Sequence, residues 1–168
     1  MCNIAKVEET DKKKIRLDRK TALAKAEHYC AYQERAQQEV RNKLYEWGLI
    51  PWEVEEVITE LILTNFLNEE RFAKSYVSGK FNINKWGKIK IKQGLKLKKV
   101  PEKMIVNALK TIDYDDYLNA ILVAAEKKSA TLTEKDAYKR RYKLTSFLFG
   151  RGFEHNLISE VLEANNLS

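Results

Sequence analysis

One pattern of apolar residues occurs three times along this chain, shifted by 51 residues between the first two copies and by 53 between the last two. Each copy has two apolar stripes around a turn position, which holds Gly48, Lys99 or Gly152. Apolar spacings of three to five residues on both sides of a turn predict two helices joined by that turn. The alternative is an ordinary helical domain whose apolar periods coincide by chance. The repeated positions are Val40, Leu44, Gly48, Leu49, Val54, Val57 and Ile58; Ile91, Leu95, Lys99, Val100, Ile105, Ala108 and Leu109; and Leu144, Leu148, Gly152, Phe153, Ile158, Val161 and Leu162.

The composition agrees with a helical repeat, because the 168 residues are 44% hydrophobic and include only six Gly and two Pro. We therefore expect an all-α fold: three tandem three-helix units that form an elongated, curved helical-repeat array. The expected divisions are a polar, disordered tail at residues 1–18 and units at residues 19–66, 67–112 and 113–168. The expected helices are residues 21–32, 33–47, 51–64, 68–81, 86–98, 101–112, 113–128, 133–151 and 153–165.

The predicted helix ends rest on capping residues. Asn68, Asp113 and Thr133 stand at expected N-caps, each followed by acidic residues in the first turn. Gly48 and Gly152 can adopt the left-handed conformation that ends a helix, which Lys99 cannot do at low cost. The alternation of Lys and Ile over residues 88–92 is typical of a β-strand. The repeat favours a helix there, because residues 91 and 95 occupy the same repeated positions as residues 40 and 44.

The net charge of +7 is unevenly distributed. Residues 80–103 contain nine Lys and one acidic residue, Glu102, whereas residues 44–70 contain seven Glu and no Lys or Arg. A second basic run lies at residues 135–143. This asymmetry indicates a polyanionic partner on one side and leaves room for a basic partner on the other.

A helix over residues 85–99 would gather lysines in a stripe beside its core face, next to a second apolar patch. Like charges at spacings of three and four repel, so the stripe is consistent with binding to phosphates or an acidic surface. The alternative is a solvated face, with the apolar patch packed on a neighbouring unit. The stripe consists of Lys85, Lys88, Lys92, Lys96 and Lys99, and the patch of Trp86, Ile89 and Leu97.

The sequence contains no recognisable catalytic, metal or cofactor motif. Cys2 and Cys30 lack CxxC spacing, and His28 and His155 are far apart with no ligand spacing. No apolar run approaches the roughly 18 residues of a membrane span, and the N-terminus lacks the apolar core of a signal peptide. We therefore expect a cytoplasmic protein that is not an enzyme, uses no cofactor and, without a heptad seam, is a monomer.

Several motifs resemble the RecX family of regulatory proteins over about residues 20–166. The central motif comprises residues 67–73, residues 76 and 77, Gly87, Ile91, Leu95 and the turn at residues 98–100. The first-unit signature is residues 39–44, closing at Gly48. Two positions depart from the family pattern. Ala36 stands where the family has a Ser that can cap the second helix. Lys99 replaces the Gly of the central turn, so that turn is expected to be strained or shaped differently.

The resemblance implies a non-catalytic regulator that binds the RecA filament on single-stranded DNA and inhibits its ATP hydrolysis, extension and strand exchange. The alternative is a helical nucleic-acid-binding module that acts without RecA. Phe72, Tyr76 and Val77 are expected to belong to the core. The expected partner- and DNA-binding residues are Arg71, Lys80, Lys85, Lys88, Lys92, Lys96, Lys99, Arg140 and Arg141.

Overall fold

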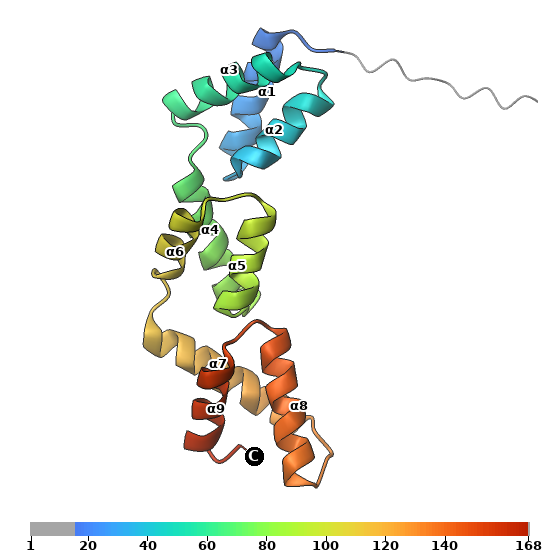
Figure 1. Cartoon of the computed structure of the whole chain (residues 1–168), viewed down its shortest axis with the longest axis vertical. Coiled ribbons are helices and arrows are strands. Elements are labelled where there is room, and N and C mark those ends of the chain that lie inside the picture. The colour runs from blue at the N-terminus through green and yellow to red at the C-terminus, as the bar shows by residue number, and fades with distance from the viewer. Residues whose placement is uncertain (1–15, 168) are drawn as a thin grey trace, which may run out of the picture.

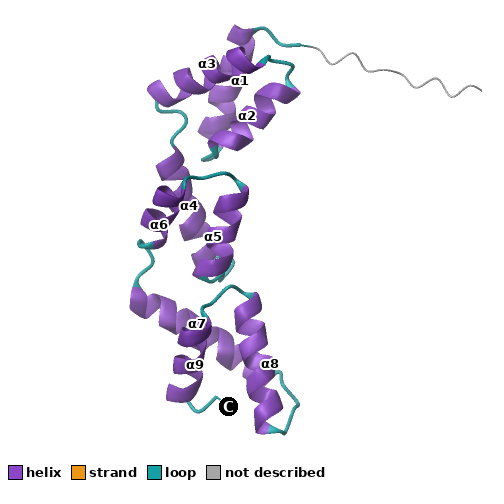
Figure 2. Cartoon of the chain, viewed as in Figure 1, coloured by secondary structure: helices purple, strands orange, loops and turns teal. Residues whose placement is uncertain are grey.

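The computed structural model describes residues 16–167, which form nine α-helices and no strand (Figure 2). The stretch over residues 88–92 is helical, as the repeat predicts. The helices are α1 (Arg19–Tyr32), α2 (Gln37–Glu46), α3 (Pro51–Leu63), α4 (Glu69–Asn82), α5 (Lys88–Leu97), α6 (Glu102–Leu109), α7 (Tyr114–Ala130), α8 (Ala137–Gly150) and α9 (His155–Ala164).

The helices form three units of three along one long axis, so the predicted all-α array is confirmed (Figure 1). Unit 1 is α1–α3, unit 2 is α4–α6 and unit 3 is α7–α9. The array is elongated and bowed. Residues 1–15 of the expected tail lie outside the described residues. The rest of that tail packs on unit 1, where the Leu17 N–H donates to the Trp47 carbonyl at 3.0 Å and Asp18 caps α1.

The repeated apolar positions are the core of the array. Seventeen of the eighteen apolar repeat positions are buried, and the remaining one, Leu109, is half-buried. The core has two parts: unit 1 has its own cluster, whereas units 2 and 3 share a second one, into which only Ala36 of unit 1 packs. Phe72 and Val77 belong to that second cluster, as predicted, and Tyr76 packs against it.

The three repeated turns share one hydrogen-bond pattern, so the central turn is not shaped differently, but Lys99 does hold the left-handed backbone that the sequence predicts to be strained. Gly48, Lys99 and Gly152 have φ values of 87°, 59° and 91°, all left-handed. In each copy the next residue's N–H reaches the carbonyl five residues back, as in Val100 to Leu95 at 3.2 Å. The repeat therefore imposes one turn on three sequences, although a lysine is unfavourable in that conformation.

Helices α8 and α5 begin later than predicted. Helix α8 begins at Ala137, because Asp136, not Thr133, accepts the Lys139 N–H as N-cap. Helix α5 begins at Lys88, because the Trp86 N–H closes the end of α4 on the Lys80 carbonyl and the Gly87 N–H donates to the Arg151 carbonyl of unit 3. Lys85 and Lys99 therefore lie in turns before and after α5.

Helix α2 also starts later than predicted, at Gln37, and Ala36 leaves it without a hydroxyl cap. Two carboxylates replace that cap. Glu39 accepts the Ala36 N–H at 3.0 Å, and Glu69, at the start of α4, accepts the Gln37 N–H at 2.9 Å. The first N–H groups of α2 are thus satisfied partly from the next unit.

None of the helices within residues 16–167 is long and apolar enough to cross a membrane.

Candidate partner and nucleic-acid interface

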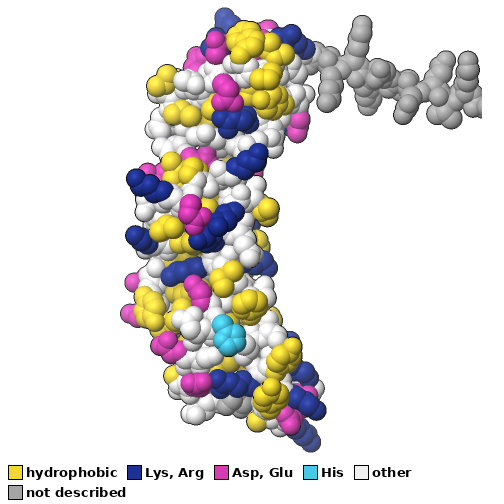
Figure 3. All heavy atoms as spheres, viewed as in Figure 1, with side chains coloured by type: hydrophobic (Ala, Val, Ile, Leu, Met, Phe, Trp, Pro, Cys, Tyr) yellow, Lys and Arg dark blue, Asp and Glu magenta, His cyan; other side chains and the backbone are white. Residues whose placement is uncertain are grey.

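Unit 2 carries most of the positive charge. Residues 67–112 contain twelve Lys and Arg and three Glu, a net charge of +9, so the rest of the chain sums to −2. Lys and Arg side chains gather over this central part of the array on the face shown in Figure 3. A basic segment of this size in the middle of an extended surface suits a polyanionic partner.

Three predicted lysines lie on one side of α5, and two of them share an acidic partner. Lys92 and Lys96 both ion-pair with Glu102 in the first turn of α6; the Lys96–Glu102 distance is 3.3 Å. The two lysines lower the pKa of the Glu102 carboxyl, mainly through the Lys92 hydrogen bond. Because one carboxylate faces two ammonium groups, the cluster keeps a net positive charge.

Lys88, the third predicted lysine of α5, and Lys80 of α4 lie over aromatic rings. The Lys80 ammonium is 4.8 Å from the centre of the Trp86 ring, and the Lys88 ammonium is 4.4 Å from the centre of the Tyr117 ring. Cation–π contacts hold these side chains against the surface without neutralising their charge. They can still bind an anion, in an orientation set by the rings.

The two turn lysines are exposed. Lys85 and Lys99 have φ values of 56° and 59° and form no ion pair within residues 16–167. Lys85 lines a cleft of about 460 Å³ between units 2 and 3, together with Lys127 and Arg151. Sequence reasoning missed these last two residues. Arg151 could have been noticed, because it directly precedes the repeated turn glycine.

The three predicted arginines have intramolecular partners. Arg71 pairs with Glu34 and donates to the Asn65 and Phe66 carbonyls, so it holds the loops between helices. Arg140 donates to the Ser129 and Leu132 carbonyls and closes the loop before α8. Arg141 pairs with Glu163 at 2.6 Å. These contacts give Arg71 and Arg140 structural roles that single-sequence spacing does not reveal.

The acidic segment of unit 1 is largely neutralised within the molecule. Glu53, Glu55, Glu56 and Glu60 pair with arginines from outside that segment, and Glu46 and Glu70 pair with lysines. Glu69 is buried and holds the Gln37 N–H. This surface therefore offers a basic partner less free charge than the sequence suggests.

The described residues show no assembly suited to metal-dependent or thiol chemistry. No group of three or more His, Cys, Asp or Glu that could hold a metal occurs within residues 16–167. Burial raises the pKa of the Cys30 thiol to about 11, so that side chain stays protonated at neutral pH.

Comparisons with known proteins identify the array. Models of the first, second and third three-helix domains of RecX match residues 22–61, 68–109 and 115–162. A regulatory protein RecX of Clostridium acetobutylicum is 35% identical over 133 residues, which are 77% of this chain and 61% of that protein. One from Prosthecochloris aestuarii is 32% identical over 87% of this chain and 94% of its own length. The chain spans only 53% of a 27% identical relative from Bacillus mycoides.

Solved structures share the fold. A crystal structure of RecX from Lactobacillus salivarius superposes with a TM-score of 0.82 over 89% of this chain and 97% of the other, at 23% identity. A second regulatory protein RecX gives a TM-score of 0.80 at 22% identity, over 86% of this chain and 71% of the other. At these identities the structures establish the architecture, whereas the domain matches and the Prosthecochloris relative establish the family. The chain belongs to the RecX family of regulatory proteins.

Proposed function

We propose that this protein is a non-catalytic regulator that binds the RecA nucleoprotein filament and inhibits its ATPase, its extension and strand exchange. The observation that carries the proposal is the basic central unit, set in an extended array whose family is that of RecX regulatory proteins. Such an array can contact several neighbouring protomers of a filament at once. Many modest contacts on one rigid chain then give strong binding through avidity.

In this proposal, unit 2 faces the negatively charged part of the filament, either acidic protein surface or DNA backbone. Lys85, Lys96 and Lys99 are exposed, with Lys96 sharing Glu102 with Lys92, while Lys88 and Lys80 are held over rings. Lysines of this kind bind phosphate or carboxylate groups with little dependence on base sequence. Inhibition would then depend on occupancy of the filament and not on chemistry within this chain.

The test uses a variant that removes charge from unit 2 and, of the contacts described above, gives up only the Lys96–Glu102 ion pair. K85N/K96Q/K99N neutralises three lysines, keeps the Lys92–Glu102 pair and places Asn, which tolerates positive φ, at both turn positions. The control K20Q/K25Q/K43Q removes the same net charge from unit 1. We expect the unit 2 variant to bind RecA-coated single-stranded DNA at least about tenfold more weakly, and the control to stay within about threefold.

Binding to bare single-stranded DNA separates this function from the alternative of a nucleic-acid module that acts without RecA. A regulator of the filament binds RecA-coated DNA more tightly than bare DNA at the same salt concentration. Equal binding to the two, with a steep loss as salt rises, contradicts the proposal and favours the nucleic-acid module.

A further inference from the structure

Helix α8 of unit 3 presents a row of exposed aromatic rings that none of the functions above uses. Tyr138, Tyr142 and Phe149 are 81%, 67% and 55% exposed. At 3.6 residues per turn they lie within about 40° of one another around the helix. Leu144 and Leu148, which are fully buried, lie about 100–140° further around the helix. The row is therefore an outward face of α8 and not a frayed edge of the core.

No hydrogen bond within residues 16–167 involves the hydroxyl of Tyr138 or Tyr142. Their rings are also absent from the aromatic pairs and cation–π contacts of the described residues. The faces of these rings are therefore open to solvent, and a flat partner could cover them. Three exposed rings in line indicate a surface that binds something.

The charge around the row indicates what binds there. Helix α8 has four Lys and Arg and no acidic residue. On the helix surface, Lys139 and Lys143 lie on one side of the row and Arg141 lies on the other. Cationic groups therefore flank the aromatic row on both sides. Lys139 forms no ion pair within the described part of the chain, whereas Lys143 and Arg141 pair with Glu134 and Glu163. In Figure 3, hydrophobic and basic side chains lie together over α8, at the lower right.

We propose that this face of α8 binds single-stranded nucleic acid, with unpaired bases stacked on Tyr138, Tyr142 and Phe149 and phosphates held by the flanking cations. A single strand offers both required features, flat bases with exposed faces and a negative backbone. A duplex hides its base faces, and an acidic peptide would leave the rings uncovered. From Tyr138 to Phe149 the helix rises about 16 Å, the length of about five stacked nucleotides. The assignment is independent of the filament-binding role proposed for unit 2.

The test measures binding of the full chain to a fluorescein-labelled (dT)20 by fluorescence anisotropy. For Y138A/Y142A/F149A we expect the Kd to rise at least about tenfold, because each stacked base contributes substantially to such binding. Y138F/Y142F keeps the rings and should stay within about twofold of the wild type. All the changed side chains are exposed, so circular dichroism should show an unchanged helix content.

Two further measurements separate stacking from charge. An abasic oligonucleotide with the same number of phosphates should bind the wild type about as weakly as (dT)20 binds the alanine variant. K139Q/K143Q should reduce the slope of log Kd against log salt by about one to two, whereas the alanine variant should leave that slope unchanged.

Equal binding of (dT)20 by the wild type and the alanine variant would overturn the proposal, as would equal binding of (dT)20 and the abasic strand by the wild type. An alanine variant that binds (dT)20 normally but loses affinity for RecA-coated DNA would also overturn it, and would assign the row to a protein partner. Loss of (dT)20 binding together with normal filament inhibition would support this proposal and leave the role of unit 2 intact.

Discussion

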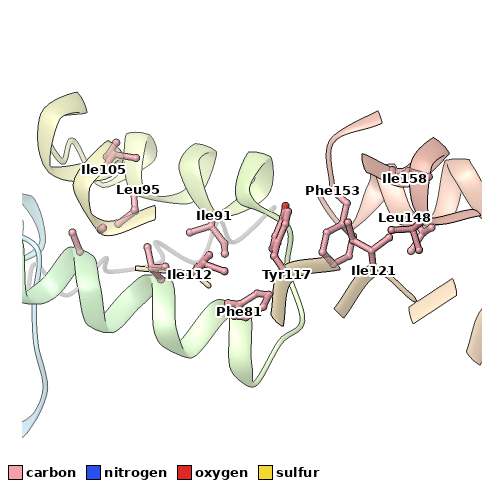
Figure 4. Packing of buried hydrophobic residues seen from close by; sticks show 14 of the residues in the cluster. Phe81, Ile91, Leu95, Ile105, Ile112, Tyr117, Ile121, Leu148, Phe153 and Ile158 are labelled. Carbon is pink, nitrogen blue, oxygen red and sulfur yellow. The ribbon is translucent and has the colours of Figure 1, made fainter. Parts of the chain in front are cut away.

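Units 1 and 2 are joined by charged groups, whereas units 2 and 3 are joined by a continuous apolar core. At the first junction Lys98 reaches Glu39 at 2.6 Å, and the buried Glu69 holds the Gln37 N–H. At the second, the Tyr117 ring lies between Phe81 and Phe153, with ring centres 5.8 and 5.6 Å apart (Figure 4). The two junctions follow the division of the core into two clusters.

At both junctions, the first N–H of the second helix of one unit, which has no acceptor within its own helix, is satisfied by the next unit. Gln37 in α2 and Lys88 in α5 are equivalent under the 51-residue shift, and each donates its N–H to a side chain of the next unit. In α2 the acceptor is a carboxylate; in α5 it is the Tyr117 hydroxyl, which itself donates to Glu154. Burial and the Glu154 hydrogen bond raise the Tyr117 pKa, so this hydroxyl stays neutral over the working pH range.

Backbone contact distinguishes the second junction further. The Gly87 and Ile89 N–H groups donate to the Arg151 and Gly152 carbonyls at 2.9 and 3.0 Å. This approach requires glycine, because a Cβ on Gly87 would lie 2.1 Å from the Gly152 carbonyl oxygen. Close backbone contact brings the aromatic rings together and closes the core. The first junction, linked by partly exposed ions, should therefore respond to salt and pH more than the second.

The N-terminal end of the array repeats the second junction on a small scale. The Leu17 N–H donates to the Trp47 carbonyl, and Trp47 is the residue of unit 1 equivalent to Arg151 in unit 3. Residues 16 and 17 thus occupy the position that Gly87 occupies on the turn of unit 3.

The largest expected effect comes from Gly87→Ala, which should break the backbone contact of the second junction. Its Cβ would overlap Gly152, and neither backbone can move without disturbing the shared core. We expect a loss of at least about 3 kcal/mol in the free energy of unfolding of units 2 and 3, measured by urea denaturation. Gly79→Ala is the matched control.

A Cβ at Gly79, inside α4, would meet no atom within 4 Å. That substitution should stabilise the protein by about 0.5–1 kcal/mol. Equal effects of Gly87→Ala and Gly79→Ala would mean that the second junction does not depend on backbone contact.

The next effect in size comes from Tyr117→Phe. The change keeps the ring but removes an acceptor for the Lys88 N–H at 2.8 Å and a donor to Glu154. Leaving these groups unsatisfied should cost about 1–3 kcal/mol. Thermal unfolding with hydrogen exchange at the start of α5 measures it, and unchanged protection of the Lys88 amide would be inconsistent with this role.

At the first junction, Lys98→Met should cost only about 1 kcal/mol, because the pair with Glu39 is partly exposed. A double-mutant cycle with Glu39→Gln isolates the coupling between the two side chains. The coupling should fall as salt rises from 0.05 to 0.5 M, while the effect of Tyr117→Phe should not change. Coupling that is independent of salt would remove the proposed difference between the junctions.

The smallest expected effect is that of Glu69→Gln, and it appears as a change in pH dependence. Burial raises the Glu69 pKa, so its ionised form opposes folding above that pKa, and protonation relieves the penalty as pH falls.

Glu39, at the same junction, shows the opposite shift. Burial acts to raise its pKa, but Lys98 and the Ala36 N–H outweigh burial and lower the pKa. Ionised Glu39 therefore stabilises the fold at pH values above the ordinary Glu pKa. This stabilisation is lost as the pH falls through the lowered pKa of Glu39.

Glu69→Gln should thus stabilise the protein slightly at pH 7, with the gain disappearing by about pH 4, near the ordinary Glu pKa. Urea denaturation between pH 4 and pH 8 measures the difference. A constant difference at all pH values would show that Glu69 does not titrate in this way.

Most of the fold was predictable because the apolar positions of the repeat are the positions that are buried in the core. Three aligned copies outweighed the Lys–Ile alternation over residues 88–92, and also predicted the turn at Lys99, whose left-handed backbone contradicts its own preference. Helix ends were less predictable, since Asp136 and Thr133 are both residue types that cap helices. The division of the core was not visible, because it depends on which side chains meet between units.

The candidate site was only partly predictable for the same reason. Charge counting located the basic unit 2, but it did not reveal that Glu102 holds Lys92 and Lys96 or that Arg71 ties down loops. Such partners come from other helices and have no fixed spacing along the chain. The exposure of Tyr138 likewise depends on which face of α8 packs against the other helices, which the sequence alone does not show.

The most direct test of the proposed function is ATP hydrolysis by the cognate RecA on single-stranded DNA, titrated with this protein. The account predicts saturable inhibition by the wild type, and a shift to at least about tenfold higher concentration for K85N/K96Q/K99N but not for K20Q/K25Q/K43Q. Unchanged ATPase activity at concentrations where the protein binds bare DNA would contradict a role in filament regulation.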